Sequence, residues 1–183
     1  SLKSTFSPSG NTFGSIQDAI NSAKSGDTIN LNGKTYIGNG TRITINKSII
    51  ISGGQESSKA TLDAKNLSGI IIVNSANVKL INCNFINANF RAVTFVNDNG
   101  SVINCNFRDN CGNANSHLRA FSNCTNFLLE NSNFYNGYCL NNTNVAINAK
   151  NSTVRNCTFI NNTVMNGENQ TVIGAAMQVG QSA

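Results

Sequence analysis

The residues best suited to acid–base chemistry gather in one stretch of the chain. Asp109, His117 and Arg119 lie there, and Arg91 and Arg108 precede them. The reaction that such residues would serve is cleavage of a polysaccharide. Glycoside hydrolysis, however, needs two or three carboxylates that converge on one bond, and a Ca²⁺-dependent lyase site needs several Asp together with an arginine base.

The supply of carboxylates is too small for either reaction. The whole chain has eight acidic residues, and only Asp109 belongs to this grouping. The chain also has a single His and no Cys-x-x-Cys pair among its six Cys, a pattern that does not favour zinc. We therefore predict no catalytic residue, no metal and no cofactor, and we expect His117 to be a loop or edge residue.

An internal repeat indicates the elements that must position these side chains. The segments KLINCNF, SVINCNF, LLENSNF and TVRNCTF occupy 79–85, 101–107, 128–134 and 153–159, and their Asn residues are separated by 22, 27 and 25 positions. Within each segment Cys or Ser, and then Phe, alternate with polar residues. This alternation places the Cys and Phe side chains on one face of a β-strand.

A repeat of this length, with several short strands in each unit, is typical of a solenoid. No helical or leucine-spaced segment accompanies the repeat, and β-branched residues favour strands. We predict an all-β protein, a right-handed single-stranded parallel β-helix of about six coils, stacked at about 4.8 Å. The β-helix should cover residues 28–183, and the final segment TVIGAAMQVGQSA leads us to expect truncation at the C-terminal end.

Two columns of stacked side chains should hold the coils together. Each repeated Asn is expected at a bend between strands, where it tolerates left-handed geometry and bonds neighbouring groups. The coils would then carry an asparagine ladder formed by Asn82, Asn104, Asn131 and Asn156. A second column should stack inside the coil and comprises Phe85, Phe107, Phe134 and Phe159, with Cys83, Cys105 and Cys157 beside it as reduced core residues.

The segments 107–118 and 134–144 are predicted as two long loops at the same corner of adjacent coils. Their exposed side chains are our candidate binding residues: Arg108, Asp109, His117, Tyr135 and Tyr138. Exposed Tyr residues can stack on sugars or on protein partners. Cys111 and Cys139 fall in equivalent places in these loops, so a disulfide between them is one hypothesis and free thiols are the alternative.

Residues 1–27 have a different pattern. Ile16, Ala19, Ile20 and Ala23 recur at helical spacing, Ser15 is a candidate N-cap, and Gly26 follows where a helix should end. The pattern predicts a short α-helix over 15–24 that covers the first coil, followed by a strand over 28–31.

Composition narrows the classes of partner. The chain has 183 residues, 35 of them Asn, with 39% hydrophobic residues, 11% charged residues and a net charge of +5. The basic residues form no run in the sequence, so nucleic-acid binding is not expected. No segment is apolar enough to predict insertion into a membrane.

The chain resembles the β-helix repeat regions of adhesin-like surface proteins of methanogenic archaea. The resemblance is carried by the opening FGSIQDAINSAKSGDTINL and by units such as VKLINCNFINA and STVRNCTFINN. It implies an extracellular protein at the cell surface or cell wall and implies no catalytic residues.

Two functions follow from these patterns. The first is a non-catalytic module that acts in adhesion or as a structural spacer of the cell envelope. Its partners would be a cell-surface glycan, a protein ligand, or copies of itself joined end to end. The alternative is a fragment of a polysaccharide-active enzyme, a lyase or a glycosidase.

Overall fold

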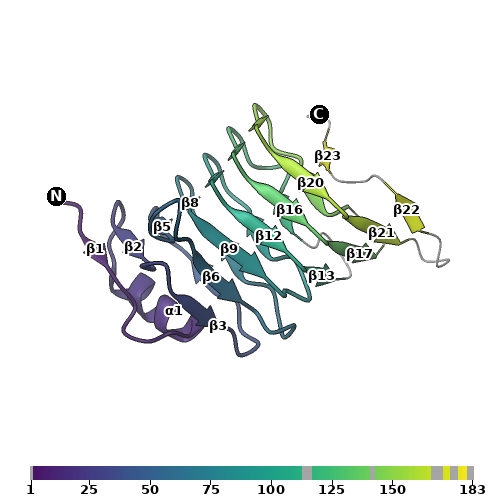
Figure 1. Ribbon diagram of the computed structural model, residues 1–183. Helices are drawn as coiled ribbons and strands as arrows, with labels where there is room; N and C mark the ends of the chain where they lie inside the picture. The colour runs from purple at the N-terminus through teal and green to yellow at the C-terminus, as the bar shows by residue number, and fades with distance from the viewer. Residues whose placement is uncertain (1, 113–116, 141–142, 166–170, 174–176, 181–183) are drawn as a thin grey trace.

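The computed structural model describes residues 2–112, 117–140, 143–165, 171–173 and 177–180. The chain forms a β-solenoid whose parallel strands stack turn upon turn, as predicted (Figure 1). Three walls run along the stack, here called sheets A, B and C, and a smaller sheet D joins them from the fourth turn onward. Sheets B and C each contain six strands, one from every turn.

The walls are built from very short strands. Sheet A contains β1 (Thr5–Phe6), β2 (Thr28–Asn30), β5 (Ile50–Ser52), β8 (Lys79–Ile81), β11 (Ser101–Ile103), β15 (Leu128–Glu130) and β19 (Thr153–Arg155). Sheet B contains β3 (Thr35–Ile37), β6 (Ala60–Asp63), β9 (Cys83–Ile86), β12 (Asn106–Arg108), β16 (Asn133–Tyr135) and β20 (Thr158–Ile160). Sheet C contains β4 (Ile43–Ile45), β7 (Ile71–Val73), β10 (Val93–Phe95), β14 (Leu118–Ala120), β18 (Val145–Ile147) and β23 (Gln178–Val179).

Sheet D corrects the prediction of two long loops. It contains β13 (Cys111–Gly112), β17 (Tyr138–Leu140), β21 (Thr163–Met165) and β22 (Thr171–Ile173), and only its last pair is antiparallel. The segments 107–118 and 134–144 therefore contain paired strands. Cross-coil backbone hydrogen bonds order β13 and β17, whereas residues 113–116 and 141–142 lie outside the described part of the chain.

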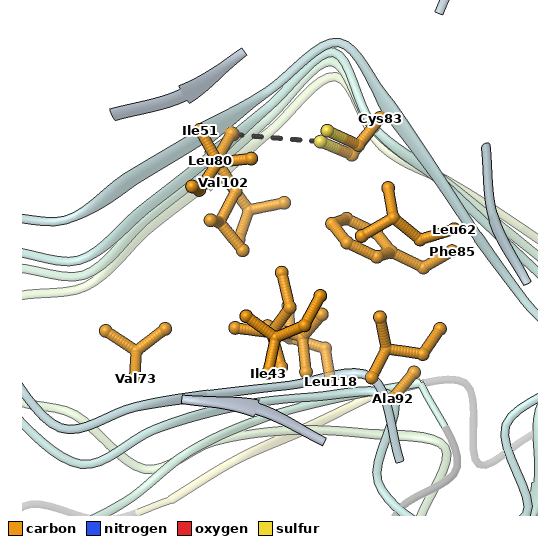
Figure 2. Close-up of a cluster of buried hydrophobic side chains, with 14 of the residues drawn as sticks. Ile43, Ile51, Leu62, Val73, Leu80, Cys83, Phe85, Ala92, Val102 and Leu118 are labelled. Atoms are coloured by element: carbon orange, nitrogen blue, oxygen red, sulfur yellow. Dashed lines mark hydrogen bonds between the residues drawn. The ribbon is translucent and has the colours of Figure 1, made fainter. Parts of the chain in front are cut away.

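The repeated Phe residues stack inside the coil, as expected. The register of sheet B aligns Phe85, Phe107, Phe134 and Phe159. Their ring centroids lie 5.0, 4.7 and 5.0 Å apart along the column. Leu62 continues this column in the preceding coil, and Cys83 lies beside it among aliphatic side chains (Figure 2). Each buried ring contributes about 1.5–3 kcal/mol by leaving water.

Asparagine turns the chain at three corners of the coil. Among the described residues, 13 of the 15 non-glycine residues with positive φ are Asn. One column is the predicted set Asn82, Asn104, Asn131 and Asn156; a second comprises Asn77, Asn99, Asn126 and Asn151; and the third comprises Asn87, Asp109, Asn136 and Asn161. Asn adopts this conformation at lower cost than other residues with a Cβ, which explains the extreme Asn content.

The most regular side-chain ladder lies two positions away from the predicted series. In the predicted column the described amide-to-amide bond joins Asn156 to Asn131, and Asn82 instead donates to the Gly54 carbonyl at 2.8 Å. A continuous ladder runs over the outer face of sheet B, where Asn133 donates to Asn106 and Asn106 to Asn84, each at 2.9 Å. A strand holds amides about 4.8 Å apart in one orientation. One bend column forms a similar ladder, in which Asn126 donates to Asn99 at 3.1 Å and Asn99 to Asn77 at 2.9 Å.

The helix α1 (Phe13–Ser22) caps the first coil, two residues earlier than predicted. Its N-cap is Thr12, whose hydroxyl accepts from the Ser15 amide, so the prediction of Ser15 as N-cap is wrong. Phe13, Ile16 and Ile20 are buried against the coil. Gln17 also satisfies the edge of sheet C, because its side chain accepts from Thr44 N at 2.8 Å and donates to Thr44 O at 3.0 Å.

Candidate functional site

The candidate residues separate into an interior group and a surface group. His117 belongs to the interior, and the expectation that it lies on an exposed loop face is wrong, because its side chain is completely buried. It contacts the edges of the stacked rings, with centroids 6.1 Å from Phe107 and 5.6 Å from Phe134. The single His is therefore part of the packed core.

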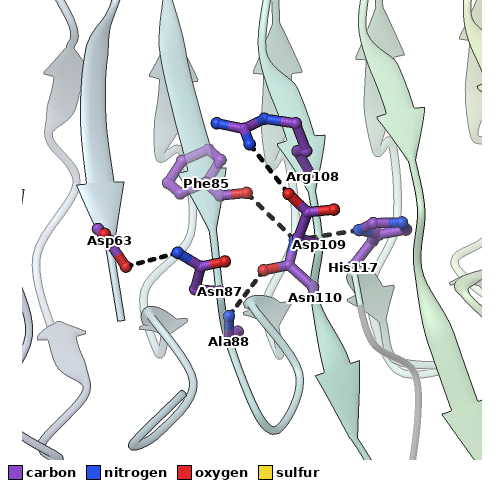
Figure 3. Close-up of polar contacts among 8 residues, drawn as sticks. All are labelled: Asp63, Phe85, Asn87, Ala88, Arg108, Asp109, Asn110 and His117. Atoms are coloured by element: carbon purple, nitrogen blue, oxygen red, sulfur yellow. Dashed lines mark hydrogen bonds and ion pairs between the residues drawn. The ribbon is translucent and has the colours of Figure 1, made fainter. Parts of the chain in front are cut away.

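Two asparagines hold the imidazole in place. Asn110 donates to His117 Nδ1 at 3.0 Å, and His117 Nε2 lies 2.8 Å from Asn162 Oδ1 (Figure 3 shows the Asn110 contact). Because Nδ1 accepts a hydrogen bond from the Asn110 amide, the ring proton is on Nε2, which donates to Asn162 Oδ1. Burial lowers the pKa of His117 from 6.5 to about 4, and the bond to Asn162 and the nearby charge of Asp109 oppose this shift.

The bridging role of His117 follows from a missing side chain. Asn110 accepts from Ala88 N and donates to Phe85 O. Asn162 repeats this pattern with Gly137 N and Phe134 O. The coil between them has Gly137 at the equivalent position, and a Cβ there would meet His117 and Asn144. The imidazole occupies the space that the missing side chain leaves.

Asp109 lies at a corner of the coil and has a structural explanation. It has φ +57 and lies in the third corner column with Asn87 and Asn136. Its carboxylate forms an ion pair with Arg108 at 2.9 Å, as Figure 3 shows. Asp109 and His117 thus share a corner but not a site, because the imidazole is tied to Asn110 and Asn162 inside the core. The structure does not assemble them into an acid–base pair.

Arg108 and Tyr135 form the surface group. The register of sheet B pairs Ile86 with Arg108 and Arg108 with Tyr135, so the three side chains form one outward row. The amide ladder of Asn84, Asn106 and Asn133 runs parallel to it, two positions earlier in each strand. The two rows line a shallow groove of about 370 Å³.

Sequence reasoning identified two of the six residues in this groove. The sequence shows the ladder residues only as the polar residues that alternate with Cys and Phe, namely Asn84, Asn106 and Asn133. That alternation was the available signal for a surface position, because a residue between two inward-facing residues of a strand must face outward. Ile86 gave no signal, since an apolar residue at the end of a strand is usually assigned to the core.

The predicted disulfide is not supported by the strand register. Cys111 pairs with Tyr138, and Cys139 pairs with Gly112, so the two cysteines are offset by one residue. Successive residues of a strand point to opposite faces, and accordingly Cys111 is exposed while Cys139 is buried. None of the six cysteines forms a disulfide. Tyr138 lies in sheet D, away from the groove lining.

Within the described ranges, His, Cys, Asp and Glu side chains do not form a group of three or more that could hold a metal ion. Among the same residues, no helix has the length and apolar character required to cross a bilayer.

Neither protein-family models, nor curated proteins, nor solved structures match this chain.

Proposed function

We propose that this protein is a non-catalytic surface module that binds an uncharged glycan in the groove on sheet B. The observation that carries the proposal is the pairing of a continuous amide ladder with a row that contains Tyr135 and Arg108. Amides repeat at the coil spacing of about 4.8 Å and present the same donor and acceptor at each step. Such a surface suits a polymer of similar repeating hydroxyl groups.

The chemistry of the ladder leaves groups available for a ligand. Each amide has two N–H donors and an oxygen that can accept two hydrogen bonds. The Asn84–Asn106–Asn133 ladder uses one donor and one acceptor of Asn106. Its remaining donor and acceptor capacity can bond sugar hydroxyls, and the Tyr135 ring offers an apolar face with a polar end.

The charge of the groove favours an uncharged ligand. Arg108 is the only charged residue among the described residues that line the groove, and the carboxylate of Asp109 neutralises it at 2.9 Å. The same ion pair supports a non-catalytic function, because Asp109 is engaged and His117 is buried elsewhere. A location outside the cell, a role in adhesion or as an envelope spacer, and kinship with adhesin-like archaeal proteins are proposed from the sequence resemblance.

A glycan array tests the proposal directly. The wild-type protein should bind a set of uncharged glycans, and Tyr135→Ala should lose at least tenfold in affinity. Tyr138→Ala is the matched control, since Tyr138 lies outside the groove, and it should bind as the wild type does. Equal affinity of Tyr135→Ala and the wild type would show that the groove on sheet B is not the glycan-binding site. Release of reducing ends or unsaturated uronates from any bound polysaccharide would show an enzyme instead.

A further inference from the structure

Three arginines that are far apart in the sequence gather on one side of the coil. Arg42 lies 5.9 Å from the ring centroid of Phe90, and Arg91 lies 5.0 Å from the same ring. Arg91 also lies 5.4 Å from Phe121, and Arg119 lies 4.4 Å from it. The five side chains thus alternate as Arg42, Phe90, Arg91, Phe121 and Arg119, with each ring shared by two guanidinium groups. We call this set the arginine row.

Among the described residues, Arg42 and Arg91 lack the carboxylate partners that Arg108 and Arg155 have. Arg108 is paired with Asp109, and Arg155 with Glu130. Within the part of the chain that the structure describes, no carboxylate lies within ion-pair distance of Arg42 or Arg91. Desolvation and then the charges of Arg119 and Arg42 lower the pKa of Arg91. Cation–π contacts of about 0.5–2 kcal/mol each offset part of this repulsion.

Unsatisfied buried atoms lie in the same region. The Nε atom of Arg91 is buried without a hydrogen-bond partner, and so is the hydroxyl of Thr94. Thr94 is on β10 and is paired in register with Arg119 on β14. A buried donor without a partner costs about 1–3 kcal/mol. An incoming group with several acceptor oxygens would satisfy the Arg91 donor and supply the missing negative charge.

The arrangement also indicates the shape of the ligand. Arg42 immediately precedes β4, Arg91 lies two residues before β10, and Arg119 is within β14. Sheet C orders these strands as β4, β7, β10 and β14, so the backbone positions span three coil steps, or about 14 Å. The charges form a line along the solenoid instead of converging on one point. A linear polyanion fits a line better than a single small anion does.

We propose that the arginine row binds a linear acidic polysaccharide whose carboxylates repeat along the chain. Arg binds carboxylates through paired N–H donors, and all three arginines are half-buried and within reach of a ligand at the surface. Single-stranded nucleic acid is the less suitable polyanion. Its recognition relies on bases stacked on open aromatic faces, and guanidinium groups already cover the faces of Phe90 and Phe121.

Binding of oligogalacturonate, a linear polyuronate, measured by titration calorimetry tests the proposal. Arg91→Met keeps the aliphatic stem and removes the charge, so affinity should fall at least tenfold. Arg42→Met, at the end of the row, should also weaken binding and serves if Arg91→Met fails to fold. Arg155→Met removes an arginine outside the row and should bind like the wild type. Binding should weaken as NaCl is raised, because salt screens the charges.

Two results would overturn the assignment of the arginine row as a site for acidic polysaccharide. Equal affinity of Arg42→Met, Arg91→Met and wild type would exclude the row as the site. Binding of single-stranded DNA or inorganic phosphate as tight as that of oligogalacturonate would exclude a preference for acidic polysaccharide. The sheet B groove is tested separately, because Tyr135→Ala should leave oligogalacturonate binding unchanged.

Discussion

His117 and Asn162 are 45 positions apart in the chain, yet Nε2 of one lies 2.8 Å from Oδ1 of the other inside the coil. The same imidazole accepts from Asn110 at 3.0 Å, so it joins asparagines that belong to coils separated by one full turn. This link spans the coil in which Gly137 offers no side chain. The only His of the protein is thereby a structural residue of its core.

The stability of the fold should depend on pH through His117. The folded state holds its pKa at about 4, against 6.5 for an unperturbed His. As pH falls below 6.5, His117 binds a proton in the unfolded chain but stays neutral in the folded protein. The free energy of unfolding therefore decreases until about pH 4. The total loss should be about 3 kcal/mol. Urea denaturation at intervals between pH 7 and pH 4 measures it.

His117→Gln provides the comparison, because it removes the titrating group. Its free energy of unfolding should be lower at pH 7 but nearly constant across the same pH range. Asp27 and Asp63 add only a small loss near pH 4, because their pKa values are lowered from 3.8 and most of their effect falls at lower pH. Parallel pH profiles for variant and wild type would contradict the assignment.

Gly137→Ala should destabilise the protein strongly. A Cβ at this position would collide with Asn144 and His117, which are held in the core. Forced displacement of packed side chains costs about 1–3 kcal/mol, and the lost bonds of His117 add to that. Gly14→Ala is the control, because its Cβ meets only Thr12 Oγ1 at 3.6 Å within the helix. The control should be neutral or up to about 1 kcal/mol more stable by thermal denaturation.

Asn104 should tolerate Gly better than Val. Its φ is +53, a conformation that a β-branched residue adopts only with strain. Asn104→Val should therefore lose about 1–2 kcal/mol, while Asn104→Gly should stay within a few tenths of a kcal/mol of the wild type. Chemical denaturation of both variants separates backbone strain from loss of the side chain. A Gly variant as unstable as the Val variant would show that the amide group matters more than φ.

Thiol labelling should distinguish the cysteines by burial. Under native conditions a small alkylating reagent should modify Cys111 first and Cys157 more slowly, while Cys83, Cys105, Cys124 and Cys139 stay protected. Mass spectrometry after labelling in denaturant without reductant should count six modified thiols. A mass that corresponds to four modified thiols, with Cys111 linked to Cys139, would refute the register argument.

The inward side chains were predictable because they depend on local alternation. Phe85, Phe107, Phe134 and Phe159 recur at the coil length and alternate with polar residues, so repeat and period together require a stacked column. The bend at Asn82, Asn104, Asn131 and Asn156 was likewise visible in the sequence. The ladder of Asn84, Asn106 and Asn133 was not assigned, because the sequence does not show which asparagine bonds its neighbour and which bonds the backbone.

The position of His117 was predicted wrongly for a related reason. Its burial depends on the absence of a side chain at Gly137, which is in the following coil and 20 positions later in the sequence. The Cys111–Cys139 disulfide was equally undecidable from spacing, since a shift of one residue between β13 and β17 exchanges an inward position for an outward one.

By itself, the sequence determined that this chain winds into stacked parallel strands, that inward and outward side chains alternate along them, and that Asn82, Asn104, Asn131 and Asn156 turn one of the corners. Those features need only the alternation of neighbouring residues along the chain and a segment that recurs every 22 to 27 residues. Only the tertiary structure decided which side chains meet across coils. It places the amide ladder beside Tyr135 and joins Asn110 to Asn162 through His117. It also brings Arg42, Arg91 and Arg119 into one row. Those meetings depend on the register between coils, and unequal repeats of 22, 27 and 25 residues leave that register to the packing of the whole solenoid.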